Sequence, residues 1–147
     1  MSTPPLTRSI GSAERTMRAL LEHVLANKHL SFTQWTALVF TSSGPLSTAE
    51  IVQRQLAGHV VSNEPEARQA VEDLIGMSLL TESPGKMLYH TEEGRDLFAS
   101  LSKSIEQITG TLFGDLPQAD LEATHRTLLE IALRANKILA TKSFITN

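Results

Sequence analysis

The stretch LSTAEIVQRQLAGHVVSNEPEARQAVEDLIGMSLL, from Leu46 to Leu80, contains two short helical patterns separated by a polar turn. In the first pattern Glu50 follows Ser47 by three residues, which is the spacing of a capping box at a helix start. The apolar residues expected to face inward from this helix are Ile51, Val52 and Leu56. The pattern predicts a short helix that begins directly after Ser47.

The second helical pattern begins at Asn63, which is a favourable N-cap residue. Glu66 repeats the cap-and-glutamate spacing, and Pro65 stands in the first turn, where a proline is well tolerated. Its apolar stripe consists of Ala67, Ala70, Val71 and Leu74. We therefore expect a helix over about Glu64 to Met77.

Two further helices are predicted upstream of this stretch. The segment MSTPPLTRSIGS reads as an arm, after which Ser12 can cap a helix from about Ala13 to Asn27. The next helix fits FTQWTALVFTS, with Trp35, Leu38 and Val39 on one side, and the breaker SSGP at Ser42 to Pro45 ends it.

Downstream of the stretch the apolar period changes from helical to extended. Two short runs, Leu79 to Ser83 and Lys86 to Thr91, are joined by a Pro-Gly turn and predict a β-hairpin. Thr91 then caps a long helix whose apolar seam is Phe98, Leu101, Ile105, Ile108 and Leu112. Pro117 breaks this helix, and a final long helix is marked by Leu121, His125, Leu128, Ala132, Ala135 and Leu139.

Three short helices followed by a β-hairpin are the parts of a winged helix-turn-helix, in which the third of the short helices enters the major groove of DNA. All four parts lie between Thr33 and Thr91. The fold class is thus mainly α with a small β-hairpin wing. The long flanking helices carry apolar seams that so small a lobe cannot cover, which favours a dimer built on a two-fold interface.

The chain resembles the MarR family of bacterial transcription regulators. The resemblance rests on LSFTQWTALVF, PLSTAEIVQRQL, AVEDLIGMSLL and, most recognisably, TEEGRDLF. It implies a cytoplasmic homodimer that binds a pseudo-palindromic operator in double-stranded DNA, and a small aromatic or phenolic effector between lobe and dimer region. The expected organisation is an N-terminal arm and helix over residues 1–30, a DNA-binding lobe over 31–98 and C-terminal dimerisation helices over 99–147.

Candidate DNA contacts lie on the predicted reading helix and around it. Arg68 and Gln69 are the candidates for reading bases, because arginine pairs bidentately with guanine and glutamine with adenine. The candidates for positioning phosphates are Ser47, Thr48, Arg54, Ser62, Asn63 and Lys86. The same helix also carries Glu64, Glu66, Glu72 and Asp73, an acidic balance that repels a duplex. Compared with the family pattern, the turn AGHVVSN is longer and the wing, TESPGKMLYH, is shorter, with Lys86 as its only cation.

These departures motivate an alternative, a winged-helix dimer that does not bind DNA and acts as a protein-interaction or ligand-binding module. In either case the aromatic residues His29, Phe32, Trp35 and Phe98 are candidates for lining an effector crevice. Aromatic side chains at helical spacing are also the ordinary content of a core, so both readings stay open.

Composition narrows the remaining classes. With a net charge of −3 and no cysteine, the chain has no thiol chemistry and no thiolate metal site. Glu122 and His125 share a helical face but form only half of a metal site, so no metal or cofactor is expected. There is no nucleophile elbow, phosphate-binding glycine loop or metal triad, so we expect a protein that is not an enzyme.

Overall fold

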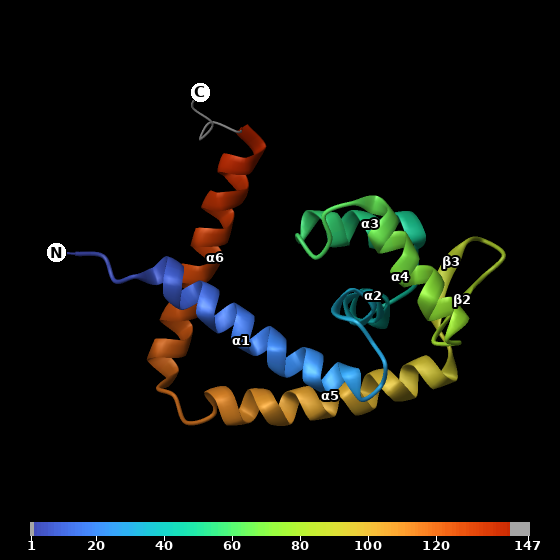
Figure 1. The fold of residues 1–147 in the computed structure, drawn as a ribbon, viewed down its shortest axis with the longest axis horizontal. Coiled ribbons are helices and arrows are strands. Elements are labelled where there is room, and N and C mark those ends of the chain that lie inside the picture. The colour runs from blue at the N-terminus through green and yellow to red at the C-terminus, as the bar shows by residue number, and fades with distance from the viewer. Residues whose placement is uncertain (1, 142–147) are drawn as a thin grey trace. The chain divides into compact units, whose positions relative to one another are not determined.

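The computed structural model describes residues 2–141. Its elements in chain order are α1 (Leu6–Ala26), α2 (Phe32–Ser42), β1 (Leu46–Ser47), α3 (Thr48–Ala57), α4 (Glu64–Gly76), β2 (Leu80–Glu82), β3 (Met87–His90), α5 (Glu92–Phe113) and α6 (Gln118–Thr141) (Figure 1). The chain divides into two compact units, one ending at Glu106 and the other beginning at Gln107, and the boundary lies within α5.

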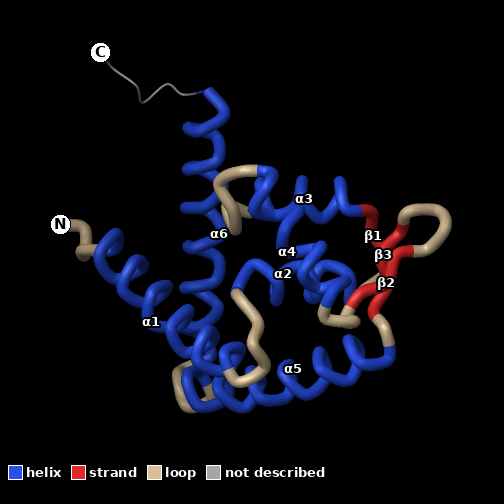
Figure 2. Tube along the Cα trace, turned by 45° about the vertical axis from the view of Figure 1, so that its right-hand side comes forward, coloured by secondary structure: helices blue, strands red, loops and turns tan. Residues whose placement is uncertain are grey.

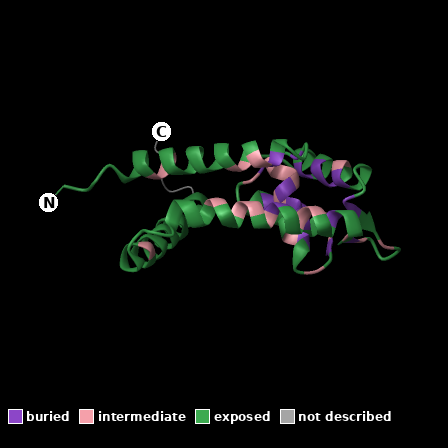
Figure 3. Cartoon of the chain, turned by 90° about the horizontal axis from the view of Figure 1, so that it is seen from below, coloured by how far each residue is buried: buried purple, intermediate pink, exposed green. Residues whose placement is uncertain are grey.

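The first unit contains the winged-helix lobe, whose core is closed by α2, α3, α4 and the sheet. The largest fully buried apolar side chains are Leu25, Leu38, Ile51, Val71, Leu74, Leu80 and Leu88. Figure 3 shows the buried residues gathered in this lobe. The predicted helices at Phe32, Ser47 and Asn63 and the predicted hairpin are confirmed, and with them the mainly α fold with a small wing.

A third strand joins the expected hairpin. The described residues form an antiparallel sheet in the order β1-β3-β2, in which Leu46 pairs with Leu88 and Leu80 pairs with His90 (Figure 2). The sequence did not reveal β1 because it is only two residues long and leads directly into the N-cap of α3. Its consequence is that α3 is tied to the wing through the sheet as well as through packing.

The junction between wing and α5 explains the residues TEEG. The Thr91 hydroxyl donates to the carbonyl of Ser78 at 2.6 Å and accepts from the backbone N–H of Gly94 at 2.9 Å, which confirms Thr91 as a cap. Gly94 is buried, and a Cβ at this position would collide with the carbonyl oxygen of Leu79. Glycine is therefore required here by the close approach of two backbones.

Helix α1 begins earlier than the sequence suggested. It starts at Leu6 rather than near Ala13, and Ser12 lies inside it, where its carbonyl accepts from the Thr16 hydroxyl at 2.8 Å. The prediction was wrong because Pro5 at the helix start is compatible with a first turn, and Gly11 costs a helix only about 1 kcal/mol. The N-terminal arm is correspondingly short.

Two side chains expected to face inward do not. Leu56 is 36% exposed and Val39 is 38% exposed, whereas the polar Gln55 is fully buried. The Gln55 amide nitrogen donates to the Thr33 carbonyl at 2.9 Å and to the Thr36 hydroxyl at 3.0 Å, so it links α3 to α2. A buried glutamine is stable where its donors are satisfied in this way, and such partners are invisible in a linear pattern.

The second unit consists of the end of α5 and α6, with the helix break at Pro117 as expected. None of the residues of α6 is buried. Its large exposed apolar side chains are Leu128, Leu129, Ile131, Leu133, Ile138 and Leu139. No helix within residues 2–141 has the length and apolar character needed to cross a membrane.

Candidate nucleic-acid interface

The outer face of α4 is the candidate reading surface. Ala67, Ala70, Val71 and Leu74 are buried against the lobe, and this leaves Arg68, Gln69 and the acidic residues exposed. The Asn63 side chain accepts from the backbone N–H of Glu66 at 3.0 Å, which fixes the start of the helix. The helix is thus anchored along one face and presents the opposite face to solvent.

Arg68 lies beside an acidic neighbour on the same helix. Its Nε is 2.7 Å from Oε1 of Glu64, and the two side chains are 49% and 54% exposed. Because an exposed pair at this spacing contributes only about 0.3–0.5 kcal/mol, whereas a bidentate contact to guanine discriminates by about 1–3 kcal/mol, Arg68 can leave Glu64 for a base edge. The ion pair positions Arg68 without locking it.

Gln69 and Asp73 form part of a link between α4 and α2. The Gln69 amide donates to Oδ1 of Asp73 at 2.8 Å, and the Gln34 amide donates to Oδ2 of Asp73 at 3.1 Å. Gln34 also accepts from the backbone N–H of Ser31 and closes the capping box of α2. Asp73 therefore has a structural role, and its carboxylate is satisfied by two amides.

The start of α3 is a capping box, as the sequence predicted. The Ser47 hydroxyl accepts from the N–H of Glu50, and Oε1 of Glu50 accepts from the N–H of Ser47, both at 3.1 Å. These hydrogen bonds from the backbone and side chain of Ser47 lower the pKa of Glu50. Thr48 follows in the first turn and is partly buried. A phosphate at this helix end would meet a carboxylate that already uses the first amide.

The remaining phosphate candidates are separated along the surface. Arg54 is exposed, with its guanidinium 6.0 Å from the ring centre of Phe40. Ser62 is exposed beside the Asn63 cap. Lys86 occupies the wing tip with a φ of 66°, and its Nζ lies 3.6 Å from Oε1 of Glu82. These cations are few, and each of them also has a nearby partner in the chain.

The four candidates for an effector crevice do not form one cavity wall. Trp35 is buried and its ring stacks on Phe98 with centroids 5.2 Å apart, so both belong to the packing between α2 and α5. The Phe32 ring lies 4.3 Å from the Arg18 guanidinium of α1. His29 is exposed in the turn after α1, with a φ of 59°. Of the four, only Phe98 also borders the cavity described next.

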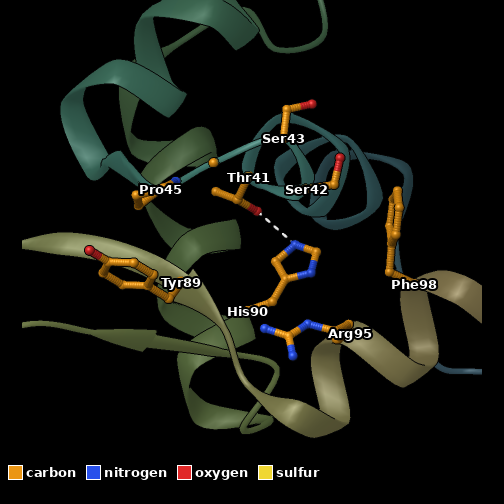
Figure 4. Close-up of a pocket in the computed structure, with 9 residues that line it drawn as sticks. Thr41, Ser42, Ser43, Pro45, Tyr89, His90, Arg95 and Phe98 are labelled. Atoms are coloured by element: carbon orange, nitrogen blue, oxygen red, sulfur yellow. Dashed lines mark hydrogen bonds between the residues drawn. The ribbon is translucent and has the colours of Figure 1, made fainter.

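A cavity of about 340 Å³ lies between the end of α2, the following loop, β3 and the start of α5 (Figure 4). It is lined by Thr41, Ser42, Ser43, Gly44, Pro45, Tyr89, His90, Arg95 and Phe98. Sequence reasoning missed His90 and Arg95 because the two residues stand in the hairpin end and the TEEGR exit, where the pattern signals structure. The nearness of both to the SSGP loop is tertiary information.

His90 is held to α2 from within this cavity. Its Nε2 lies 2.9 Å from the Leu38 carbonyl oxygen and 3.0 Å from the Thr41 hydroxyl oxygen. A carbonyl oxygen only accepts, so Nε2 carries the proton and donates. Burial lowers the pKa of His90, the Leu38 hydrogen bond opposes that shift, and the Arg95 charge adds to it.

Comparison with known proteins places this architecture. No protein-family model matches the chain, and no curated protein sequence matches it either. Solved structures do match. A MarR family transcriptional regulator from Streptomyces coelicolor is 20% identical, with 90% of this chain and 94% of that chain covered and a TM-score of 0.71.

Two other neighbours have small-molecule names in their descriptions. CouR from Rhodococcus jostii RHA1, bound to p-coumaroyl-CoA, is 17% identical with a TM-score of 0.72 over 87% of this chain and 92% of that chain. BpsR of Bordetella bronchiseptica, whose DNA binding is regulated by 6-hydroxynicotinic acid, is 19% identical with a TM-score of 0.68 over 90% of this chain and 96% of that chain. The chain therefore has the MarR-like winged-helix fold.

Proposed function

We propose that the protein is a DNA-binding transcription regulator that acts as a homodimer on a pseudo-palindromic operator and responds to a small-molecule effector. The observation that carries the proposal is α4, a helix anchored on one face and bearing Arg68 and Gln69 on the other, within a MarR-like fold. A helix presented in this way fits the major groove, where arginine and glutamine read guanine and adenine.

The homodimer is supported by the exposed apolar side chains near both chain ends. In the first unit, α1 exposes Leu6, Met17 and Leu20, and in the second unit α6 exposes the apolar residues given above. Such exposure is unfavourable for an isolated chain and is typical of a surface covered by a partner. We propose that residues 1–30 and 99–147 form the dimerisation region and residues 31–98 the DNA-binding lobe.

A second candidate function is favoured by the charge of α4. Its exposed surface holds Glu64, Glu66 and Glu72, with Arg68 as its cation, and the wing adds only Lys86. Because phosphate neutralisation supplies much of the affinity for DNA, so few cations favour weak binding with little salt dependence. The candidate is a winged-helix dimer that serves as a protein-interaction or ligand-binding module.

A titration of fluorescently labelled DNA separates the two functions. The duplex would come from the region upstream of the protein's own coding sequence, and an unrelated duplex of equal length would be the control. At low salt, an increase in anisotropy at micromolar protein or below for the upstream duplex alone is expected of the regulator. Absence of specific binding at micromolar protein would instead support the module.

A further inference from the structure

The cavity beside His90 has the size and construction of a small-molecule site. Continuing the register in which Leu46 pairs with Leu88, the chain before β1 passes opposite Tyr89 and His90, so the SSGP loop forms one wall. The other wall is the start of α5. A volume of about 340 Å³ falls at the lower end of the range usual for ligand pockets, about 300–1,000 Å³. The walls come from elements fixed by hydrogen bonds, so the shape persists without a ligand.

Arg95 gives this cavity an uncompensated positive charge. Within residues 2–141, ion pairs engage Arg18, Arg68, Lys86 and Arg134, but none engages Arg95. In Figure 4 its guanidinium lies beside His90. The carboxyl end of α2 contributes at most about half an elementary negative charge, so it does not neutralise a guanidinium. The charge and the planar donor fork suit a carboxylate, which can accept two parallel hydrogen bonds.

Aromatic rings border the same space. The Phe98 ring is held from behind by its stack on Trp35 and contacts the His90 ring edge-on at a centroid distance of 5.6 Å. Tyr89 is 44% exposed and stands on the opposite side of the cavity in Figure 4. Exposed aromatic surface beside a cation favours a flat apolar body with one anionic end over a compact ion such as phosphate.

We propose that this cavity binds a small aromatic carboxylate, with Arg95 holding the carboxylate and Tyr89 and Phe98 contacting the ring. The inference deepens the proposed function, because it names the site and the ligand class of the effector. The site differs from the crevice anticipated around His29 and Phe32. It lies where the C-terminal end of α2, the wing strand β3 and the start of α5 meet, so a ligand there contacts the wing directly.

Trp35 provides a reporter for the test, since it is the single tryptophan of the chain and stacks on Phe98. The full-length protein would be titrated with benzoate while tryptophan emission is recorded, and calorimetry would give the affinity independently. Benzamide, which has the same shape without the charge, is the ligand control. Saturable binding of benzoate with a Kd below about 10 mM, at least about tenfold tighter than that of benzamide, is expected.

Two variants assign the binding to the cavity. Arg95→Gln should weaken benzoate binding at least about tenfold, whereas Lys103→Gln, which removes an exposed cation further along α5, should not. Tyr89→Ala leaves Arg95 in place and should weaken binding a few-fold. Circular dichroism and the melting temperature would verify that the variants fold, as expected for exposed positions.

The inference is overturned if benzoate fails to bind below 10 mM, if benzamide binds as well, or if Arg95→Gln binds like the unaltered protein. Equal binding of inorganic phosphate would also contradict the aromatic ligand class. The titrations contain no DNA, so benzoate binding through Arg95 in a protein that ignores DNA would refute the proposed regulator and leave this site standing.

Discussion

The winged-helix lobe and the C-terminal unit treat their apolar side chains in opposite ways. In the lobe, residues such as Leu38, Ile51 and Leu74 are fully buried by the chain itself. In the unit from Gln107 onward, α6 buries none of its residues and leaves Leu129 and Leu133 each 59% exposed. The lobe is complete within one chain, whereas the surface of α6 is of the kind that a second chain covers.

The largest effect is expected from charging the apolar surface of α6. Leu129→Glu combined with Leu133→Glu should convert the dimer to monomer, because a carboxylate buried in an apolar interface costs several kcal/mol. Sedimentation velocity would measure the change in mass. Thr124→Glu combined with Thr127→Glu is the matched control, since both threonines are exposed and polar, and it should stay dimeric. Identical sedimentation of the two double variants would show that α6 is not the interface.

The lobe should be most sensitive where two backbones touch. Gly94→Ala places a Cβ against the carbonyl oxygen of Leu79 and should lower the free energy of unfolding by about 3 kcal/mol. Gly76→Ala is the control, because a Cβ there meets nothing within 4 Å, and it should raise stability by about 0.5–1 kcal/mol. Urea denaturation monitored by Trp35 fluorescence compares the two. Equal stability of both variants would contradict the described packing of wing against α5.

Arg68→Ala should weaken specific DNA binding by about 1–3 kcal/mol and relax the preference at one base position. Glu64→Ala is the informative partner variant, because it releases Arg68 from its ion pair and removes a negative charge from the DNA-facing surface. It should bind as tightly as the unaltered protein or more tightly. If Arg68→Ala has no effect on anisotropy titrations, Arg68 does not read a base.

The smallest effect is a pH dependence that originates at His90. Burial lowers its pKa in the folded protein below the ordinary value of 6.5, so the folded state resists a proton that the unfolded chain accepts. Its contribution to stability is complete above pH 6.5 and declines as the pH falls through the lowered pKa. His90→Gln should flatten the loss of unfolding free energy just below pH 6.5. The contribution of Glu50, whose pKa is also lowered, is lost only below 4.5, so the windows are separate.

Local chemistry decided which features could be predicted from the sequence. Ser47, Asn63 and Thr91 cap their helices as expected, because a cap involves residues three positions apart in the chain. Gln55 and the strand β1 could not be predicted, since their partners lie in α2 and in β3.

The candidate site shows the same division. Arg68 and Gln69 could be assigned to the outer face of their helix from periodicity alone, and both are exposed there. The pairing of Gln69 with Asp73 and the further link to Gln34 could not, because Gln34 comes from a helix 39 residues away. His90 and Arg95 meet the SSGP loop only through the sheet, so no linear motif announces that cavity.

The central claim is that two copies of this chain together bind one operator. Native mass spectrometry of the protein mixed with its upstream duplex at low salt measures that stoichiometry directly. The account predicts a complex of two chains with one duplex, formed by the unaltered protein and lost in the Leu129→Glu, Leu133→Glu variant. A complex of one chain per duplex, or a dimer that forms no complex with the duplex, would contradict it.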